Sequence, residues 1–179
     1  MGAAHSRLTL PSGSRPSVSD RSDSTAGGTN RIARVVNLEL KGRVYDPFEY
    51  EVGREKIREY ARAVGETNMI YFQRDAAQAA GFTNVVAPPM FCVVFSAGAM
   101  GPAVLDQELG INLALMVHGS QEFEWFDPVV AGDTITTKVK VEDLYEKNGM
   151  EFYVFESEST NQQGKPVVKG TWTNIVRTG

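Results

Sequence analysis

The sequence has few of the residues that bind metals or form covalent cross-links. Among its 179 residues there is one cysteine, Cys92, and there are two histidines. A single cysteine cannot form an internal disulfide, and without a cluster of cysteines and histidines the chain lacks the ligand set of a zinc site. The G-x-G-x-x-G fingerprint and the P-loop pattern are missing too. We therefore expect a cytoplasmic protein that uses neither a metal ion nor a cofactor.

Positive charge is also in short supply. Lys and Arg number 18 against 22 Asp and Glu, which gives a formal charge of −4 and a pI near 5.3. Nucleic acids and anionic membranes attract basic surfaces, so neither is an expected partner.

Charge is absent altogether between residues 76 and 105, and this stretch predicts a buried helix. Pro88 and Pro89 interrupt it, so the helix runs from residue 89 to about residue 101, whereas a membrane span needs about 20 apolar residues. Proline is favoured at the first position of a helix. A helix that is apolar on all sides must be surrounded by other structure.

What is present divides the chain into two parts. Residues 1–35 are rich in Ser, Gly and Arg and have few apolar groups, so we expect a disordered N-terminal tail. Residues 36–179 are enough for one sizeable hydrophobic core and are expected to form a single domain.

Periodicity within that domain predicts both helices and strands. Four apolar residues follow at the spacing of one helix face: Ile57, Tyr60, Ala61 and Val64. Gly65 stops this helix, and Gly81 stops a short second one. Alternating patterns predict four strands, within residues 113–129, 133–147, 150–160 and 166–178, and turn-forming residues separate them.

Four successive strands joined by tight turns predict an antiparallel meander. One face of such a sheet has to be covered, and the apolar helix is the candidate. The expected fold class is therefore α+β, a long antiparallel sheet wrapped round one buried helix, which is the hotdog architecture.

Three segments in order carry a family resemblance: EVGREKIREYARAVGETN, AAGFTNVVAPPMF and HGSQEFEWFDPVVAGDTI. They resemble the MaoC-like hotdog dehydratases and hydratases over residues 36–179. More narrowly, they resemble the subgroup with a fatty-acid-synthase-type (FAS1-type) dehydratase N-terminal domain, which includes small actinobacterial (3R)-hydroxyacyl-ACP dehydratase subunits. The resemblance implies a lyase of fatty-acid metabolism that acts on acyl-ACP or acyl-CoA thioesters as a dimer of identical or unlike halves.

The motif that carries catalysis in this family is altered. Active members resemble one another in G-D-x-N-P-[LIV]-H, whereas residues 65–71 read GETNMIY. Glu66 keeps a carboxylate and Asn68 is retained, but Tyr71 stands in place of the histidine. Hydration of an enoyl thioester needs a proton shuttle of near-neutral pKa, and a phenol with a pKa of about 10 is a poor proton acceptor.

The start of the apolar helix departs from the family in the same direction. Active members read like H-G-M here, and a backbone N–H binds the thioester oxygen as charge develops. The matching residues are Pro88, Pro89 and Met90, and proline has no N–H. Losing one such donor costs about 10²–10³-fold in rate.

These departures favour a substrate-channel subunit whose partner is a second MaoC-like hotdog chain with an intact Asp/His pair. Its expected substrate-binding wall is Phe72, Pro89, Met90, Phe91, Val94 and Phe95. For Phe91 and Phe95, a purely structural place in the core is the favoured interpretation.

The resemblance also leaves the role of His118 open. It either contacts substrate at the dimer junction or is structural, and we favour the structural role because no carboxylate is spaced to pair with it. Two other functions remain: a self-sufficient hydratase that uses Glu66 with Tyr71 or His118, and a non-enzymatic protein that binds acyl thioesters.

Overall fold

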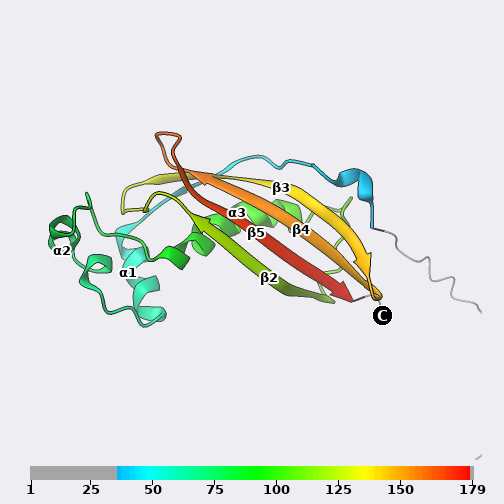
Figure 1. Ribbon diagram of the computed structural model, residues 1–179, viewed down its shortest axis with the longest axis horizontal. Helices are drawn as coiled ribbons and strands as arrows, with labels where there is room; N and C mark the ends of the chain where they lie inside the picture. Colours follow the sequence, from blue (N-terminus) through cyan, green and yellow to red (C-terminus); the bar gives the residue numbers. More distant parts are fainter. Residues whose placement is uncertain (1–35, 178–179) are drawn as a thin grey trace, which may run out of the picture. The chain divides into compact units, whose positions relative to one another are not determined.

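The computed structural model describes residues 36–177, so the predicted N-terminal tail lies outside the described residues. Their centre is one antiparallel sheet of five strands in the order β1-β3-β4-β5-β2. The strands are β1 (Phe48–Glu51), β2 (Met116–Trp125), β3 (Thr134–Lys147), β4 (Met150–Thr160) and β5 (Pro166–Arg177). Figure 1 shows β3, β4, β5 and β2 running side by side.

The four predicted strands are confirmed, but the predicted meander is wrong in one connection. β2 pairs with β5 at the far edge of the sheet and not with β3, its neighbour in sequence. The place beside β3 is taken by β1, a strand that the pattern analysis did not predict. The turn between β3 and β4 follows the sequence closely, because Asn148 and Gly149 both have positive φ, as a two-residue hairpin turn requires.

Helices pack against this sheet and beyond its end. They are α1 (Arg54–Ala63), α2 (Arg74–Ala79) and α3 (Cys92–Val104), with short 3-10 turns η1 (Leu38–Leu40), η2 (Met69–Tyr71) and η3 (Pro89–Phe91). The predicted apolar stripe of α1 is confirmed for Ile57 and Ala61, which are fully buried, and Tyr60 is half-buried, but Val64 lies just past the end of the helix and is exposed. Gly65 and Gly81 have positive φ after α1 and α2, which confirms the two predicted helix stops.

The predicted apolar helix corresponds to η3 and α3, which lie across one face of the sheet (Figure 1). α3 runs past the predicted end at Gly101, includes Pro102 and ends at Val104. We expected other structure to cover α3 on all sides, but only one face of the helix is covered. Ala97 on the other half is exposed and Val93 is half-buried, so one flank is open among the described residues.

Two apolar clusters fill the space between α3 and the sheet. The first surrounds the N-terminal half of α3, where Phe91 and Phe95 pack against Ile135 and Val167. The second surrounds the C-terminal half, where Met100 packs near Phe155. This long antiparallel sheet around one central helix is the hotdog fold, as the sequence predicted.

Candidate functional site

A cavity of about 460 Å³ lies beside the first turns of η3 and α3. Pro89, Cys92 and Phe95 form its helical wall, and Val167 and Val168 of β5 contribute as well. This volume is typical of pockets that take a small organic ligand. The wall is almost entirely apolar, so it suits a hydrocarbon chain better than a polar ligand.

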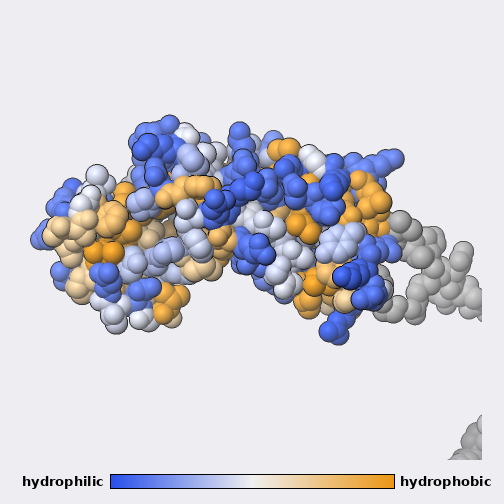
Figure 2. Space-filling model, viewed as in Figure 1, coloured by the Kyte–Doolittle hydropathy of each residue, from blue (hydrophilic) through white to orange (hydrophobic). Residues whose placement is uncertain are grey.

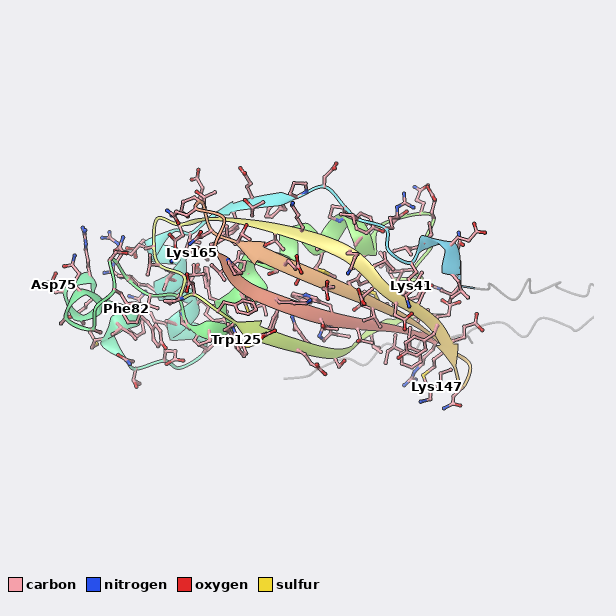
Figure 3. The ribbon with its side chains drawn as sticks, turned by 45° about the horizontal axis from the view of Figure 1, so that its top comes forward. Lys41, Asp75, Phe82, Trp125, Lys147 and Lys165 are labelled. Carbon is pink, nitrogen blue, oxygen red and sulfur yellow. The ribbon has the colours of Figure 1, made fainter. Side chains whose placement is uncertain are left out.

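The rest of the wall comes from one loop and from the end of β2 with the loop that follows it. Ile70, Tyr71 and Phe82 belong to the stretch between α1 and η3, while Trp125 ends β2 and is followed by Phe126. Phe82 and Trp125, labelled in Figure 3, mark these two contributions. In the view of Figure 2, apolar surface shows among the hydrophilic residues at the end of the domain that carries α1 and α2.

Backbone hydrogen bonds hold the first of these loops over the cavity. The amide of Val86 donates to the carbonyl of Ile70 (3.1 Å), and the amide of Ala87 donates to the carbonyl of Val129 (2.8 Å). A β-bridge joins Val86 to Val130. The loop is therefore tied to the segment after β2, and the cavity has a fixed wall rather than a free flap.

The segment of residues 65–71, GETNMIY, reaches this wall with Ile70 and Tyr71. The side chain of Asn68 caps η2 by accepting a hydrogen bond from the amide of Ile70 (3.2 Å), and η2 places Tyr71 in the cavity. Burial raises the pKa of the Tyr71 phenol, and the negative charge of Glu66 raises it further. Tyr71 and Glu66 are therefore close in space. Burial and the charge of Glu66 both keep the phenol of Tyr71 protonated near neutral pH. Such a group donates a hydrogen bond and does not accept a proton.

The first residues of the helix include two that have no N–H. Pro88 and Pro89 both line the cavity, and neither has an amide hydrogen. The carbonyl of Pro89 accepts a hydrogen bond from Trp125 Nε1 (2.9 Å), and the carbonyl of Met90 accepts one from the hydroxyl of Tyr60 (3.1 Å). The helix start is thus fixed through its carbonyl groups.

Of the expected wall residues, Pro89 and Phe95 line the cavity. Phe91 is fully buried in the core, where its ring meets that of Tyr60 edge-on at 5.5 Å. Val94 packs half-buried against the same cluster. These residues do not all meet at one site.

The other expected residues lie further out. Met90 has 44% of its surface exposed, and the ring of Phe72 lies 6.0 Å from the guanidinium carbon of Arg62. His118 is exposed on β2, with its ring 6.4 Å from that of Trp172, and it does not line the cavity.

Sequence reasoning missed Cys92, Trp125, Phe126 and Asp127 as cavity residues. Burial raises the pKa of the Cys92 thiol to about 11. Asp127 forms an exposed ion pair with Lys165 (3.4 Å) at the cavity wall. The aromatic pair Trp125 and Phe126 at the end of β2 was the available signal in the sequence.

Among residues 36–177 no helix is long and apolar enough to cross a membrane. In the same residues no group of three or more His, Cys, Asp or Glu side chains could hold a metal ion.

A hotdog domain with an apolar cavity beside its central helix defines the class of this protein. A model of the family described as FAS1-like, dehydratase domain region matches residues 39–170. The UPF0336 protein of Saccharopolyspora erythraea is 41% identical over 137 residues, which are 76% of this chain and 88% of the relative. The chain therefore belongs to the FAS1-like dehydratase-region family.

Solved structures agree with this assignment. The HadBC (3R-hydroxyacyl-ACP dehydratase) complex from Mycobacterium tuberculosis contains a chain that is 28% identical, with a TM-score of 0.66, over 76% of this chain and 96% of that one. A MaoC-like dehydratase is 26% identical with a TM-score of 0.71, over 78% of this chain and 43% of that one. The fold is the MaoC-like hotdog, as the resemblance implied.

Proposed function

We propose that this chain is the substrate-channel half of a (3R)-hydroxyacyl-thioester dehydratase or enoyl hydratase of fatty-acid-type metabolism in the cytoplasm. The Asp/His pair that performs the reaction is then supplied by a second MaoC-like subunit. The observation that carries the proposal is Tyr71, which lines the cavity where a base is required but whose pKa is raised.

The chemistry of the reaction explains why the raised pKa of Tyr71 matters. Removing water from a 3-hydroxyacyl thioester takes a proton from the carbon beside the carbonyl and delivers a proton to the departing hydroxyl. A group that alternates between these tasks needs a pKa near the working pH. Burial and the charge of Glu66 raise the pKa of the Tyr71 phenol, so it stays protonated near neutral pH.

The cavity and the helix start support binding of the substrate rather than its conversion. The apolar wall formed by Cys92, Phe95 and Val168 suits an acyl chain. Pro89 leaves no N–H at the position where charge would develop on the thioester oxygen. The cavity therefore offers an apolar place for an acyl chain but lacks the histidine and the N–H that the proposed reaction requires.

The edge of the sheet supports a hotdog partner. β2 is an outer strand, and large apolar side chains are exposed on it or next to it: Leu113, Leu115, Val117, Trp125 and Phe126. A second hotdog domain that continued the sheet at β2 would cover them and the open flank of α3. The 28% identical chain is part of the HadBC complex, which supports an assembly of this kind.

The test measures the absorbance of a conjugated short 2-enoyl thioester as water is added to it. This chain, a MaoC-like partner with an intact Asp/His motif, and their mixture are compared at equal concentrations. We expect turnover above background in the mixture and none with this chain alone. Losing a working acid or base lowers turnover by about 10²–10⁴-fold, so Glu66→Gln in this chain should cost the mixture far less.

Two results would replace the proposal. Robust turnover by this chain alone, abolished by Tyr71→Phe or Glu66→Gln, would establish a self-sufficient hydratase. Thioester binding without turnover in any combination would establish a non-enzymatic binding protein.

A further inference from the structure

The face of the sheet that points away from α3 carries an apolar row near the turn between β3 and β4. Successive side chains of a strand point to opposite faces. The inward-facing residues of this region are buried in the second cluster, and they are Leu144, Tyr153 and Val176. Their neighbours Tyr145, Phe152 and Ile175 therefore point outward, and Val117 of β2 continues the line. We call these four outward-facing residues the outer row.

The register of the strands places the residues of the outer row side by side. Tyr145 pairs with Phe152, and Phe152 pairs with Ile175. Ile175 also pairs with Val117 on β2. The rings of Tyr145 and Phe152 are stacked, with centroids 4.6 Å apart and 7° between their planes. Gly119 leaves room for Ile175, because a Cβ at Gly119 would lie 2.6 Å from Ile175 Cδ1. The four side chains thus form one continuous apolar surface.

The outer row is open to solvent in the single chain. Tyr145 has 37% of its surface exposed and Val117 has 48%, while Phe152 and Ile175 are half-buried. Cross-strand apolar pairs stabilise a sheet through the sides that touch each other. This stabilisation does not use the sides that face the solvent. Contiguous apolar surface of this kind marks a site of interaction with another protein.

The residues on the two sides of the outer row complement each other. On β3, Lys147 lies two residues from Tyr145 toward the turn, and Asp143 lies two residues away in the other direction. The residues in register with them on β4 are Met150 and Val154. In Figure 3 the strands lie in front of α3, and Lys147 is labelled near the turn. A cation therefore flanks the row on one side and a carboxylate on the other, with an apolar residue beside each.

The two flanking charges differ in their present partners. Asp143 contacts Lys41 Nζ at 2.9 Å, and both side chains are exposed. Among residues 36–177, no ion pair includes Lys147. Lys147 is thus free to bind a carboxylate of another molecule.

We propose that the outer row binds a second copy of this chain, sheet against sheet, around a two-fold axis that runs along the row. Such an axis places each residue of the row against the same residue of the other copy. It also places Lys147 over Asp143 of the second copy, and Met150 over Val154. Sheets pack face to face about 10 Å apart, a distance that two facing side chains span. The contact buries the row and gives Lys147 a carboxylate partner.

The inference does not rest on the proposed function. A hotdog partner that continues the sheet at β2 pairs with the edge of that strand and leaves the outer face uncovered. With that partner bound, the outer row joins two such pairs of subunits into a larger assembly.

Sedimentation velocity over a range of concentrations tests the contact, with the full chain alone and with its MaoC-like partner. We expect self-association that weakens at least about tenfold in Tyr145→Glu, because the change buries two carboxylates against each other at the axis. Lys147→Glu and Asp143→Lys should each weaken the association, since each places like charges together. Combined in one chain, the two reversals should restore it, because opposite charges meet again.

Val64→Glu is the matched control, since it replaces an exposed apolar residue just after α1 and should leave the association unchanged. Circular dichroism checks that each variant folds, and the exposed Lys147 and Asp143 variants carry the test if Tyr145→Glu does not.

Four results would overturn the inference. They are a chain that stays monomeric at every concentration, self-association that survives Tyr145→Glu, a combined variant that does not recover, and a one-to-one complex with the MaoC-like partner that Tyr145→Glu weakens. The second result would assign the association to β2, and the last would assign the outer row to the partner. Enoyl turnover in the mixture tests the proposed function separately, so either proposal can fail alone.

Discussion

The aromatic ring of Phe48 lies directly against the backbone of Gly98. A Cβ atom added at Gly98 would come less than 3.0 Å from three ring carbons of Phe48. Phe48 belongs to β1 and Gly98 to the middle of α3, so this contact fixes how closely the edge strand approaches the central helix. A glycine is needed here for close packing and not for a special backbone conformation.

Gly98→Ala is expected to destabilise the fold, because the added methyl forces the ring of Phe48 away from α3. Overpacking of this kind costs about 1–3 kcal/mol. Gly101→Ala in the same helix is the control, since a Cβ there meets no atom within 4 Å. Thermal unfolding should show a lower midpoint for the first variant and no decrease for the second. Equal unfolding midpoints for the two variants would mean that the ring of Phe48 moves aside without an energetic cost.

A charge on α3 should be tolerated on its open flank and not on its buried face. Ala99 is 1% exposed, so Ala99→Asp places an unpaired carboxylate in the core, which costs several kcal/mol and should prevent soluble expression. Ala97→Asp, two residues earlier at an exposed position, should leave the isolated chain folded. Soluble yield and circular dichroism distinguish the two. A folded Ala99→Asp variant would contradict the placement of α3.

Glu156 should stabilise the sheet in a pH-dependent way. Its carboxylate contacts Lys169 Nζ at 2.8 Å and Lys140 Nζ at 3.0 Å. The hydrogen bond from Lys169 lowers the pKa of Glu156, and Lys140 lowers it further against the opposing effect of burial. The folded state therefore holds the proton less tightly than the unfolded state, so the stabilisation is present at high pH and lost on acidification.

Glu156→Gln should lower the free energy of unfolding by about 1 kcal/mol at pH 7. The difference from the unmodified chain should be complete above about pH 5, past the ordinary glutamate pKa, and should vanish as the pH falls through the folded-state pKa. Urea unfolding at a series of pH values measures it. Glu158→Gln is the control, because Glu158 is 65% exposed and 3.8 Å from Lys169. A constant difference from pH 7 to pH 3 would exclude the ion pairs as its source.

Catalysis should be recoverable by restoring the family motif in this chain. We expect Glu66→Asp combined with Tyr71→His and Pro89→Gly to give hydration of an enoyl thioester by this chain alone. Tyr71→His by itself should remain at least about 10²-fold less active, because no N–H replaces that of the missing glycine. Enoyl absorbance measures both. Equal rates for the two variants would show that the N–H at residue 89 is not needed.

Features set by neighbouring residues could be predicted from the sequence. The apolar stripe of α1, the stops at Gly65 and Gly81, and the turn at Asn148 each depend on a few adjacent residues. The pairing of β2 with β5 could not be predicted in this way, because no turn joins them and the closure of the sheet around α3 decides it. β1 alternates aromatic and acidic residues, but at four residues it is too short for this alternation to predict a strand.

The candidate site was predictable to the extent that it follows a linear motif. Tyr71 and Pro89 were expected at the site, and both line the cavity. Trp125 and Asp127 reach the same cavity from the other side of the domain, and no local pattern indicates that approach. A full list of cavity residues therefore requires the three-dimensional structure.

The position of β2 at the edge of the sheet has a consequence for the amount of this chain that a cell can make. One side of β2 has no neighbouring strand among residues 36–177. Such an edge is a template for any extended segment that meets it, including one from another copy of the chain. We therefore expect copies synthesised in excess of the protein that covers β2 to aggregate or to be degraded, so that balanced production of the two becomes part of the chain's function.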